Sequence, residues 1–125
     1  MSPSARSILG TAGEAAAAAW LEARGYEILA RNVRTRCGEI DLVARTGDVV
    51  VFIEVKSRTS TRFGHPSEAI AGRKQRRLAR LAAGFMRDHG LGRRSARFDA
   101  VAIQFDATGT AVLIEHIPDA FRPEA

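Results

Sequence analysis

Two stretches of alternating apolar and polar residues, 38–45 and 49–57, flank the pair Gly47-Asp48. A Gly-Asp pair between such stretches is typical of a two-residue β-hairpin turn, and the turn fixes which residues face each other across the strands. One face of this hairpin is expected to be wholly apolar, with Ile40, Leu42, Ala44, Val51, Ile53 and Val55. The other face carries Glu39, Asp41, Val43, Phe52, Glu54 and Lys56. A slip of one residue would mix the two sets, so the alternation favours this register.

In this register Asp41 lies opposite Glu54, and Glu39 lies opposite Lys56. Side chains that face each other across two strands have Cβ atoms only about 4.5–5.5 Å apart. Two carboxylates there repel by roughly 3 kcal/mol at an effective dielectric constant near 20. A lysine relieves part of this repulsion, and a divalent cation with oxygen ligands relieves more. The alternative is an exposed polar face with an incidental Glu–Lys pair, but Val43 and Phe52 indicate that this face is partly covered.

The rest of the chain predicts two helices and three further strands around the hairpin. Alanine-rich residues followed by Gly25 are typical of a helix and its C-terminal stop, and a second apolar stripe with helical spacing ends at Gly90. The helices are expected at 7–24 and 66–89, and the strands at 26–34, 38–45, 49–57, 97–105 and 110–117. The order α-β-β-β-α-β-β indicates an α/β fold with one mixed sheet flanked by helices, in a single domain over residues 1–125.

The positive charge of the chain is concentrated in one segment. The net charge is +5, but residues 58–97 carry eleven cations against only Glu68 and Asp88. Such a segment favours a polyanionic partner, with nucleic acid as the first candidate, and a solvated arginine-rich helix face is the alternative. The residues expected to contact phosphates are Arg58, Arg62, His65, Arg73, Arg76, Arg77 and Arg80.

Seventeen of the nineteen cations are arginine, and the two lysines are Lys56 and Lys74. Lysine carries a compact ammonium whose pKa moves readily, so it suits catalysis better than arginine. Lys74 lies four residues from both Ile70 and Leu78, on the apolar stripe of the second helix. From this position a lysine can extend along the edge of the stripe toward solvent.

Cysteine content and hydropathy favour a cytoplasmic protein with no membrane partner. The single Cys37 excludes an internal disulfide and is expected to be a small buried residue. The longest apolar run, residues 15–21, is too short to span a bilayer, and Glu14 interrupts any signal-peptide core.

The hairpin also carries a known pattern. Gly38-Glu39-Ile40-Asp41-Leu42 followed by Ile53-Glu54-Val55-Lys56 resembles the D…E-x-K signature of PD-(D/E)XK nucleases, with Ile40 where the signature has proline. The chain is more closely similar to the YraN family of small bacterial proteins, which resembles the archaeal Holliday-junction resolvases. The other matching stretches are Gly13-Glu14-Ala15-Ala16, Arg31-Asn32, Arg97-Phe98-Asp99 and His116-Ile117.

This resemblance implies a restriction-endonuclease-like fold and a role for each motif residue. Asp41 and Glu54 would bind Mg²⁺, or Mn²⁺ as a substitute, together with the carbonyl of Val55. Glu14 would be a third ligand or would position a water, unless it is an ordinary surface acid. Lys56 would orient the attacking water or stabilise charge on the phosphate. Lys74, or less readily Gln75, would reach the site from the second helix.

The resemblance implies a metal-dependent endonuclease that acts on branched or otherwise structured DNA. The alternatives are a nucleic-acid-binding module that does not cleave and an accessory subunit of a DNA-processing protein, docked through residues 118–125. Because resolvases act as dimers, a homodimer is also expected. Asp99 either supports the site or forms a salt bridge with Arg97 or Arg94, whereas His89 and His116 are expected to be structural or surface residues.

Overall fold

The structure, a computed structural model, describes residues 5–59 and 72–122, and their side chains within 10–59 and 75–122. The elements follow the predicted order. They are α1 (Ala5–Glu22), β1 (Glu27–Thr35), β2 (Gly38–Thr46), β3 (Val49–Arg58), α2 (Gly72–Asp88), β4 (Ser95–Phe105) and β5 (Ala111–Phe121). The predicted helical residues 66–71 lie outside the described residues. No helix in the described part of the chain is long and apolar enough to cross a membrane.

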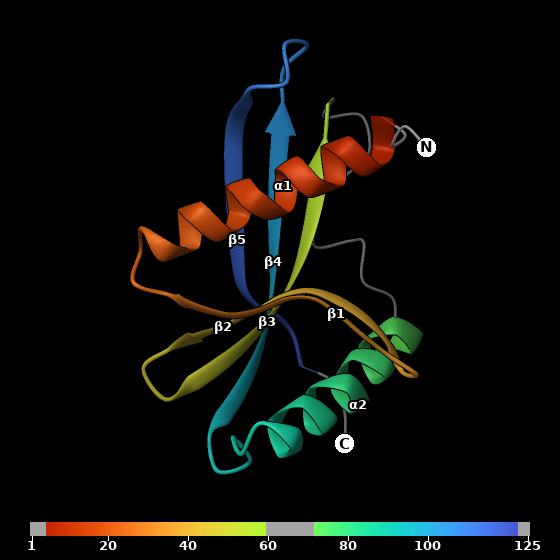
Figure 1. Cartoon of the computed structure of the whole chain (residues 1–125), viewed down its shortest axis with the longest axis vertical. Coiled ribbons are helices and arrows are strands. Elements are labelled where there is room, and N and C mark those ends of the chain that lie inside the picture. The colour runs from red at the N-terminus through yellow and green to blue at the C-terminus, as the bar shows by residue number, and fades with distance from the viewer. Residues whose placement is uncertain (1–4, 60–71, 123–125) are drawn as a thin grey trace.

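The five strands form one mixed sheet in the order β1-β2-β3-β4-β5. Neighbouring strands are antiparallel except β3 and β4, which are parallel and have α2 between them in the chain. This is the connection that a parallel pair requires, because a short turn cannot return the chain to the same end of the sheet. Figure 1 shows α1 crossing the strands in the upper half of the view and α2 lying in the lower half.

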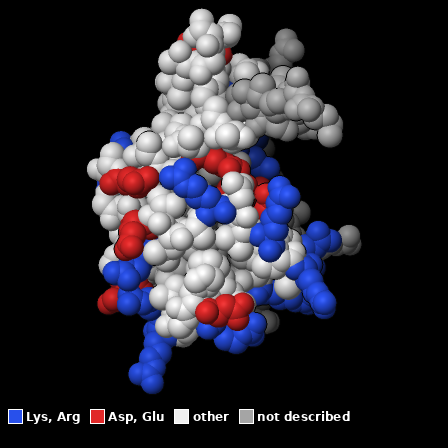
Figure 2. Space-filling model, in the orientation of Figure 1, with Lys and Arg blue, Asp and Glu red and all other residues white. Residues whose placement is uncertain are grey.

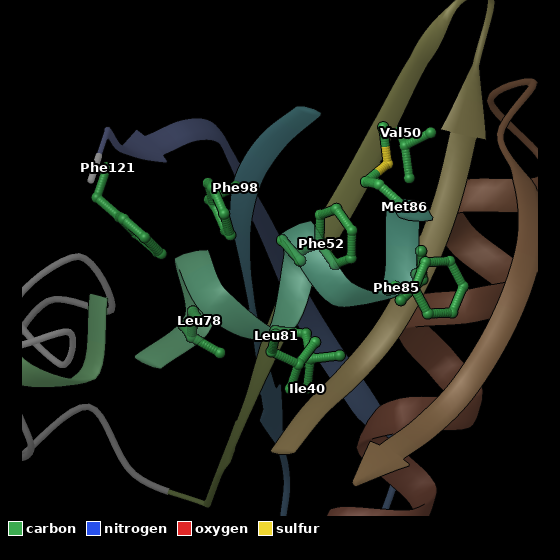
Figure 3. Packing of buried hydrophobic residues seen from close by; sticks show 11 residues of the cluster. Ile40, Val50, Phe52, Leu78, Leu81, Phe85, Met86, Phe98 and Phe121 are labelled. Atoms are coloured by element: carbon green, nitrogen blue, oxygen red, sulfur yellow. The ribbon is translucent and has the colours of Figure 1, made fainter. Parts of the chain in front are cut away.

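Each helix packs on its own part of the sheet and forms a separate hydrophobic core. Under α1, the small side chains Ala17 and Ala18 allow a close approach to β2, β3 and β4. Under α2, aromatic side chains fill the space, and Phe52 contacts the rings of Phe85 and Phe98 (Figure 3). The predicted stripe residues Leu78, Leu81 and Phe85 are all buried in this second core.

The fifth strand is longer than predicted. It was expected to end at Ile117, with an exposed segment from Pro118 onward, but it continues to Phe121. Phe121 is buried and stacks on Phe98, with ring centroids 4.8 Å apart. Asp119, at φ 53°, breaks the strand pattern that sequence reasoning relies on, and its N–H is bound by a distant side chain. Residues 118–121 are therefore part of the sheet and not a free docking tail.

Candidate functional site

The predicted hairpin register is confirmed from the turn to the pair Leu42 and Ile53, where the ladder of β2 and β3 ends. Gly47 has φ 57°, as a tight turn of this kind requires. Beyond the last pair, the N–H of Val55 donates to Asp41 Oδ2 at 2.7 Å. The Asp41 carboxylate thus takes the place of a backbone carbonyl at the point where the two strands part. Asp41 and Glu54 lie next to this point and are not a ladder pair.

The prediction for Ile40 was wrong. It was placed on the same face as Leu42, but it packs in the α2 core, in the same cluster as Leu81, while Leu42 packs under α1 (Figure 3). The neighbouring strand β1 is also irregular opposite Asp41, since Asn32 has φ 53°. Both strands therefore depart from regular alternation beside Asp41, and alternation alone cannot place the residue that precedes it.

Glu54 and Lys56 form an ion pair at the end of β3. Lys56 Nζ lies 3.1 Å from Glu54 Oε1, and the Glu54 side chain is only 8% exposed. Burying a carboxylate is costly unless a partner compensates for its charge. Lys56 supplies that compensation while its own side chain remains about one-third exposed, at 34%. The ammonium of Lys56 is therefore held beside the buried acid and still reaches solvent.

Asp41 lies among several other acids. Burial, together with the negative charges of Glu14, Glu54 and Glu39, raises its pKa to about 6, although the hydrogen bond from the Val55 N–H counteracts them. Asp41 therefore holds its proton more tightly than an ordinary aspartate does. Within the described residues, no three Asp, Glu, His or Cys side chains converge closely enough to hold a metal ion as they stand.

Glu14, which the resemblance assigns to the site, lies on α1. Its side chain is half-buried, and its charge acts on Asp41. The preceding residue, Gly13, is buried against β3 near Val55 and Ser57. The placement of Glu14 thus agrees with a role beside Asp41, and whether it binds a metal stays a prediction.

The predicted phosphate contacts fall into two groups. Arg76, Arg77 and Arg80 are exposed on α2, on the side opposite its buried stripe, and Arg58 is half-buried on β3. Figure 2 shows basic side chains along the lower part of the molecule with acidic ones between them. The side chains of Arg62, His65, Arg73 and Lys74 lie outside the described residues, so their roles stay predictions. Gln75 is half-buried in the first turns of α2.

Sequence reasoning missed a buried network around Asp99 on β4. Of the two partners that were considered, Arg97 is confirmed, with Nε and Nη2 each donating to the carboxylate at 2.8 Å. His116 Nε2 lies 2.6 Å from Asp99 Oδ2, and the N–H of Asp119 donates to Oδ1 at 2.9 Å. Burial would raise the pKa of Asp99, but the hydrogen bonds from His116, Arg97 and Asp119 outweigh it and hold the pKa below its ordinary value.

His116 is structural, as expected, but its partners were not foreseen. Its ring makes edge contacts with Trp20 and Tyr26, and the Tyr26 hydroxyl accepts a hydrogen bond from Arg97. The network therefore joins β4 and β5 to the end of α1. Arg94, the other candidate partner of Asp99, lies near Asp48 instead. The resemblance had named the stretches with Asp99 and His116, and that was the available signal.

Comparison with known proteins places the chain in a family. The sequence model of the uncharacterised protein family UPF0102 matches residues 13–103, which include Glu14 and the whole hairpin. The chain belongs to UPF0102, the YraN family.

The family match extends over nearly the whole length of individual relatives. A UPF0102 protein of Moorella thermoacetica is 51% identical over 112 residues, which cover 90% of this chain and 93% of the relative. A UPF0102 protein of Pelotomaculum thermopropionicum is 45% identical over 117 residues, or 94% and 98% of the two chains. The resemblance to the YraN family is thereby confirmed, and the names of these UPF0102 proteins state no activity.

Proposed function

We propose that this protein is a metal-dependent endonuclease that hydrolyses phosphodiester bonds in branched or otherwise structured DNA. The observation that carries the proposal is the placement of Asp41, Glu54 and Lys56 where β2 and β3 part. Two acids and a lysine at such a point supply the groups that phosphodiester hydrolysis needs, a cation site and a positive charge beside it. The negative charge of Glu14, on α1, also acts on Asp41.

The donor set fits a hard divalent cation. The groups that would hold Mg²⁺, or Mn²⁺ in its place, are the carboxylates of Asp41 and Glu54 and the carbonyl of Val55, with Glu14 as a further ligand. All are oxygen donors of the kind that Mg²⁺ prefers. A cation would also relieve the repulsion between the Asp41 carboxylate and the neighbouring acids. When bound, the ion would polarise the scissile phosphate and lower the pKa of a water.

The acids, the lysine and the arginines of this chain each have a defined role in the proposal. Asp41 ties the end of β2 to Val55 and so fixes the two strands on either side of the site. Lys56 offsets the charge of Glu54 and presents its ammonium to solvent, where it would stabilise a phosphate oxygen or orient a water. Arg76, Arg77 and Arg80 would hold the DNA backbone without reading its sequence.

A second candidate is a nucleic-acid-binding module that does not cleave, or an accessory subunit of a DNA-processing complex. The exposed arginines of α2 favour it, since they serve binding whether or not the acids act. In either case we expect the protein to act in the cytoplasm, and a homodimer would present two such surfaces to a branched substrate.

A cleavage assay separates the two candidates. Labelled four-way junctions, splayed arms and linear duplexes are incubated with Mg²⁺, with Mn²⁺ or with a chelator. We expect metal-dependent cleavage of the branched substrates. Lys56→Ala should abolish this cleavage and leave the DNA affinity within about twofold of wild type, because Lys56 is not a main phosphate contact. Asp41→Asn should also abolish cleavage, and Asp48→Asn, an exposed turn residue of the same hairpin, should not. Cleavage that survives Lys56→Ala contradicts the proposal, and DNA binding without any cleavage favours the binding module.

A further inference from the structure

Gly13 occupies an unfavourable place for a glycine. It lies inside α1, a helix otherwise rich in alanine, where glycine is less stable than alanine because it loses more backbone freedom on folding. It is also buried, whereas Gly10, one turn earlier in the helix, is half-buried. A glycine that weakens its own helix in a buried position needs a reason in packing.

The reason is a close approach of α1 to β3. A Cβ at Gly13 would collide with Ser57 Oγ and would lie 3.1 Å from Ser57 Cβ and 3.6 Å from Val55 Cγ1. At Gly10 a Cβ would have no atom within 4 Å. Of these two glycines, only Gly13 lies so close to the strand beneath it that a Cβ would meet other atoms.

Ser57 contributes volume to this contact and no hydrogen bond in the part of the chain that the structure describes. Its Oγ is buried and has no partner there. Ser57 therefore acts at this position as a small group against which the helix backbone rests. An alanine at 57 would remove the Oγ with which a Cβ at Gly13 would collide and would leave the Ser57 Cβ position 3.1 Å away, whereas a glycine would remove both atoms.

The contact adjoins the proposed site on both of its sides. On α1, Gly13 is followed directly by Glu14, and on β3, Ser57 is preceded directly by Lys56. The spacing of the two backbones at this point therefore determines how close the Glu14 carboxylate comes to the acids at the end of the hairpin. The negative charge of Glu14 does act on Asp41 at the present spacing.

We propose that Gly13 and Ser57 form a spacer that sets the distance between α1 and β3 and thereby positions Glu14 beside Asp41 and Glu54 for binding a divalent cation. This inference rests on the proposed function for the role of Glu14. Gly13 and Ser57 are positioning residues in it, since neither touches the ion or the substrate.

The test compares Mn²⁺ affinity and thermal unfolding for the full chain and four variants, Gly10→Ala, Gly13→Ala, Ser57→Gly and Gly13→Ala with Ser57→Gly. Gly13→Ala should weaken Mn²⁺ binding about tenfold, as expected for the loss of a group that orients a ligand. Ser57→Gly in the same chain should restore the affinity to within about threefold of wild type, because it removes the two closer of the three atoms that the new Cβ meets. Gly10→Ala should leave the affinity unchanged and raise the melting temperature.

The outcomes distinguish failure of the spacer from failure of the proposed function. Wild-type affinity in Gly13→Ala, or a loss that Ser57→Gly does not reverse, would overturn the spacer. If Gly13→Ala does not fold, the double variant must restore both folding and Mn²⁺ binding, and a double variant that also fails to fold overturns it. A wild type that binds no Mn²⁺ contradicts the proposed function and, with it, the role of Glu14 as a ligand. The melting temperatures then still test the contact, and additive effects of the two substitutions would overturn it.

Discussion

Asp41 contributes both to the architecture of the site and to its electrostatics. Its carboxylate ends the ladder of the hairpin by accepting the Val55 N–H, and it is buried among other acids. The sequence predicted its neighbourhood to Glu54 because the turn pair and the alternation together fix the register. It could not predict the bond to Val55, which exists only because the strands part there.

The raised pKa of Asp41 predicts that the site is destabilising at neutral pH. The pKa rises from 3.8 to about 6, so the folded state binds this proton more tightly than the unfolded state. The contribution of Asp41 to stability is therefore fully present below about pH 4 and is lost as the pH rises through about 6. Asp41→Asn should be more stable than wild type at pH 7.5 by about 2–3 kcal/mol, since one pKa unit corresponds to about 1.4 kcal/mol.

Urea unfolding with a chelator present, between pH 3.5 and pH 8, measures this difference. It should shrink toward zero near pH 4, where both side chains are neutral. Asp48→Asn is the control, since that carboxylate is 98% exposed, and it should show little change over the same range. An Asp41→Asn variant that is less stable than wild type at pH 7.5 would contradict the electrostatic account of the site.

At the scale of elements, some features of the sheet follow from the local sequence, and others depend on contacts between residues far apart in the chain. The order of the elements and the apolar stripe of α2 follow from periodicity and from the glycine stops, and both are confirmed. The end of β5 does not follow from them, because Phe121 and Asp119 are held by residues far away in the chain. Among local pairs, Arg97 and Asp99 could be foreseen as neighbours two residues apart on one strand. His116 could not be assigned to Asp99, because that contact depends on how β5 is aligned on β4.

The Asp99 network should be among the main determinants of stability outside the candidate site. Asp99→Ala removes the acceptor of four hydrogen bonds and leaves Arg97 without its acidic partner in a partly buried position. We expect the free energy of unfolding to fall by about 3–5 kcal/mol, the usual cost of breaking a buried pair from one side. Urea unfolding at pH 7 measures it, with Asp48→Ala as the control, since that side chain is 98% exposed. A loss below about 1 kcal/mol would mean that the network contributes little.

At the scale of the whole molecule, acidic and basic side chains gather in different places. The acids gather where β2 and β3 part, while the arginines of α2 face outward from the other core. This separation was predictable in part, since the excess of cations in residues 58–97 is plain in the sequence. Which of those cations share one exposed face depended on the helix, and its described part confirms Arg76, Arg77 and Arg80 as exposed.

This arrangement predicts the salt dependence of DNA binding. Arg76→Ala combined with Arg77→Ala should weaken binding to all DNA sequences alike. It should also reduce the slope of log affinity against log salt concentration by about two units. Fluorescence anisotropy between 50 and 250 mM salt, about the useful range for such contacts, measures the slope. Arg31→Ala with Arg45→Ala is the matched control, since these arginines lie near Glu22 and Glu27, and the slope should not change. An unchanged slope in the α2 variant removes this helix from the interface.

The most direct test of the central claim is to titrate Mn²⁺ into isotope-labelled protein and follow the paramagnetic broadening of the amide resonances. We expect broadening centred on Asp41, Glu54 and Val55 at low Mn²⁺ concentration. It should disappear in Asp41→Asn and persist in Asp48→Asn. Broadening that is diffuse over the surface, or that survives Asp41→Asn, would contradict a metal site where the two strands part and would leave the protein as a binding module.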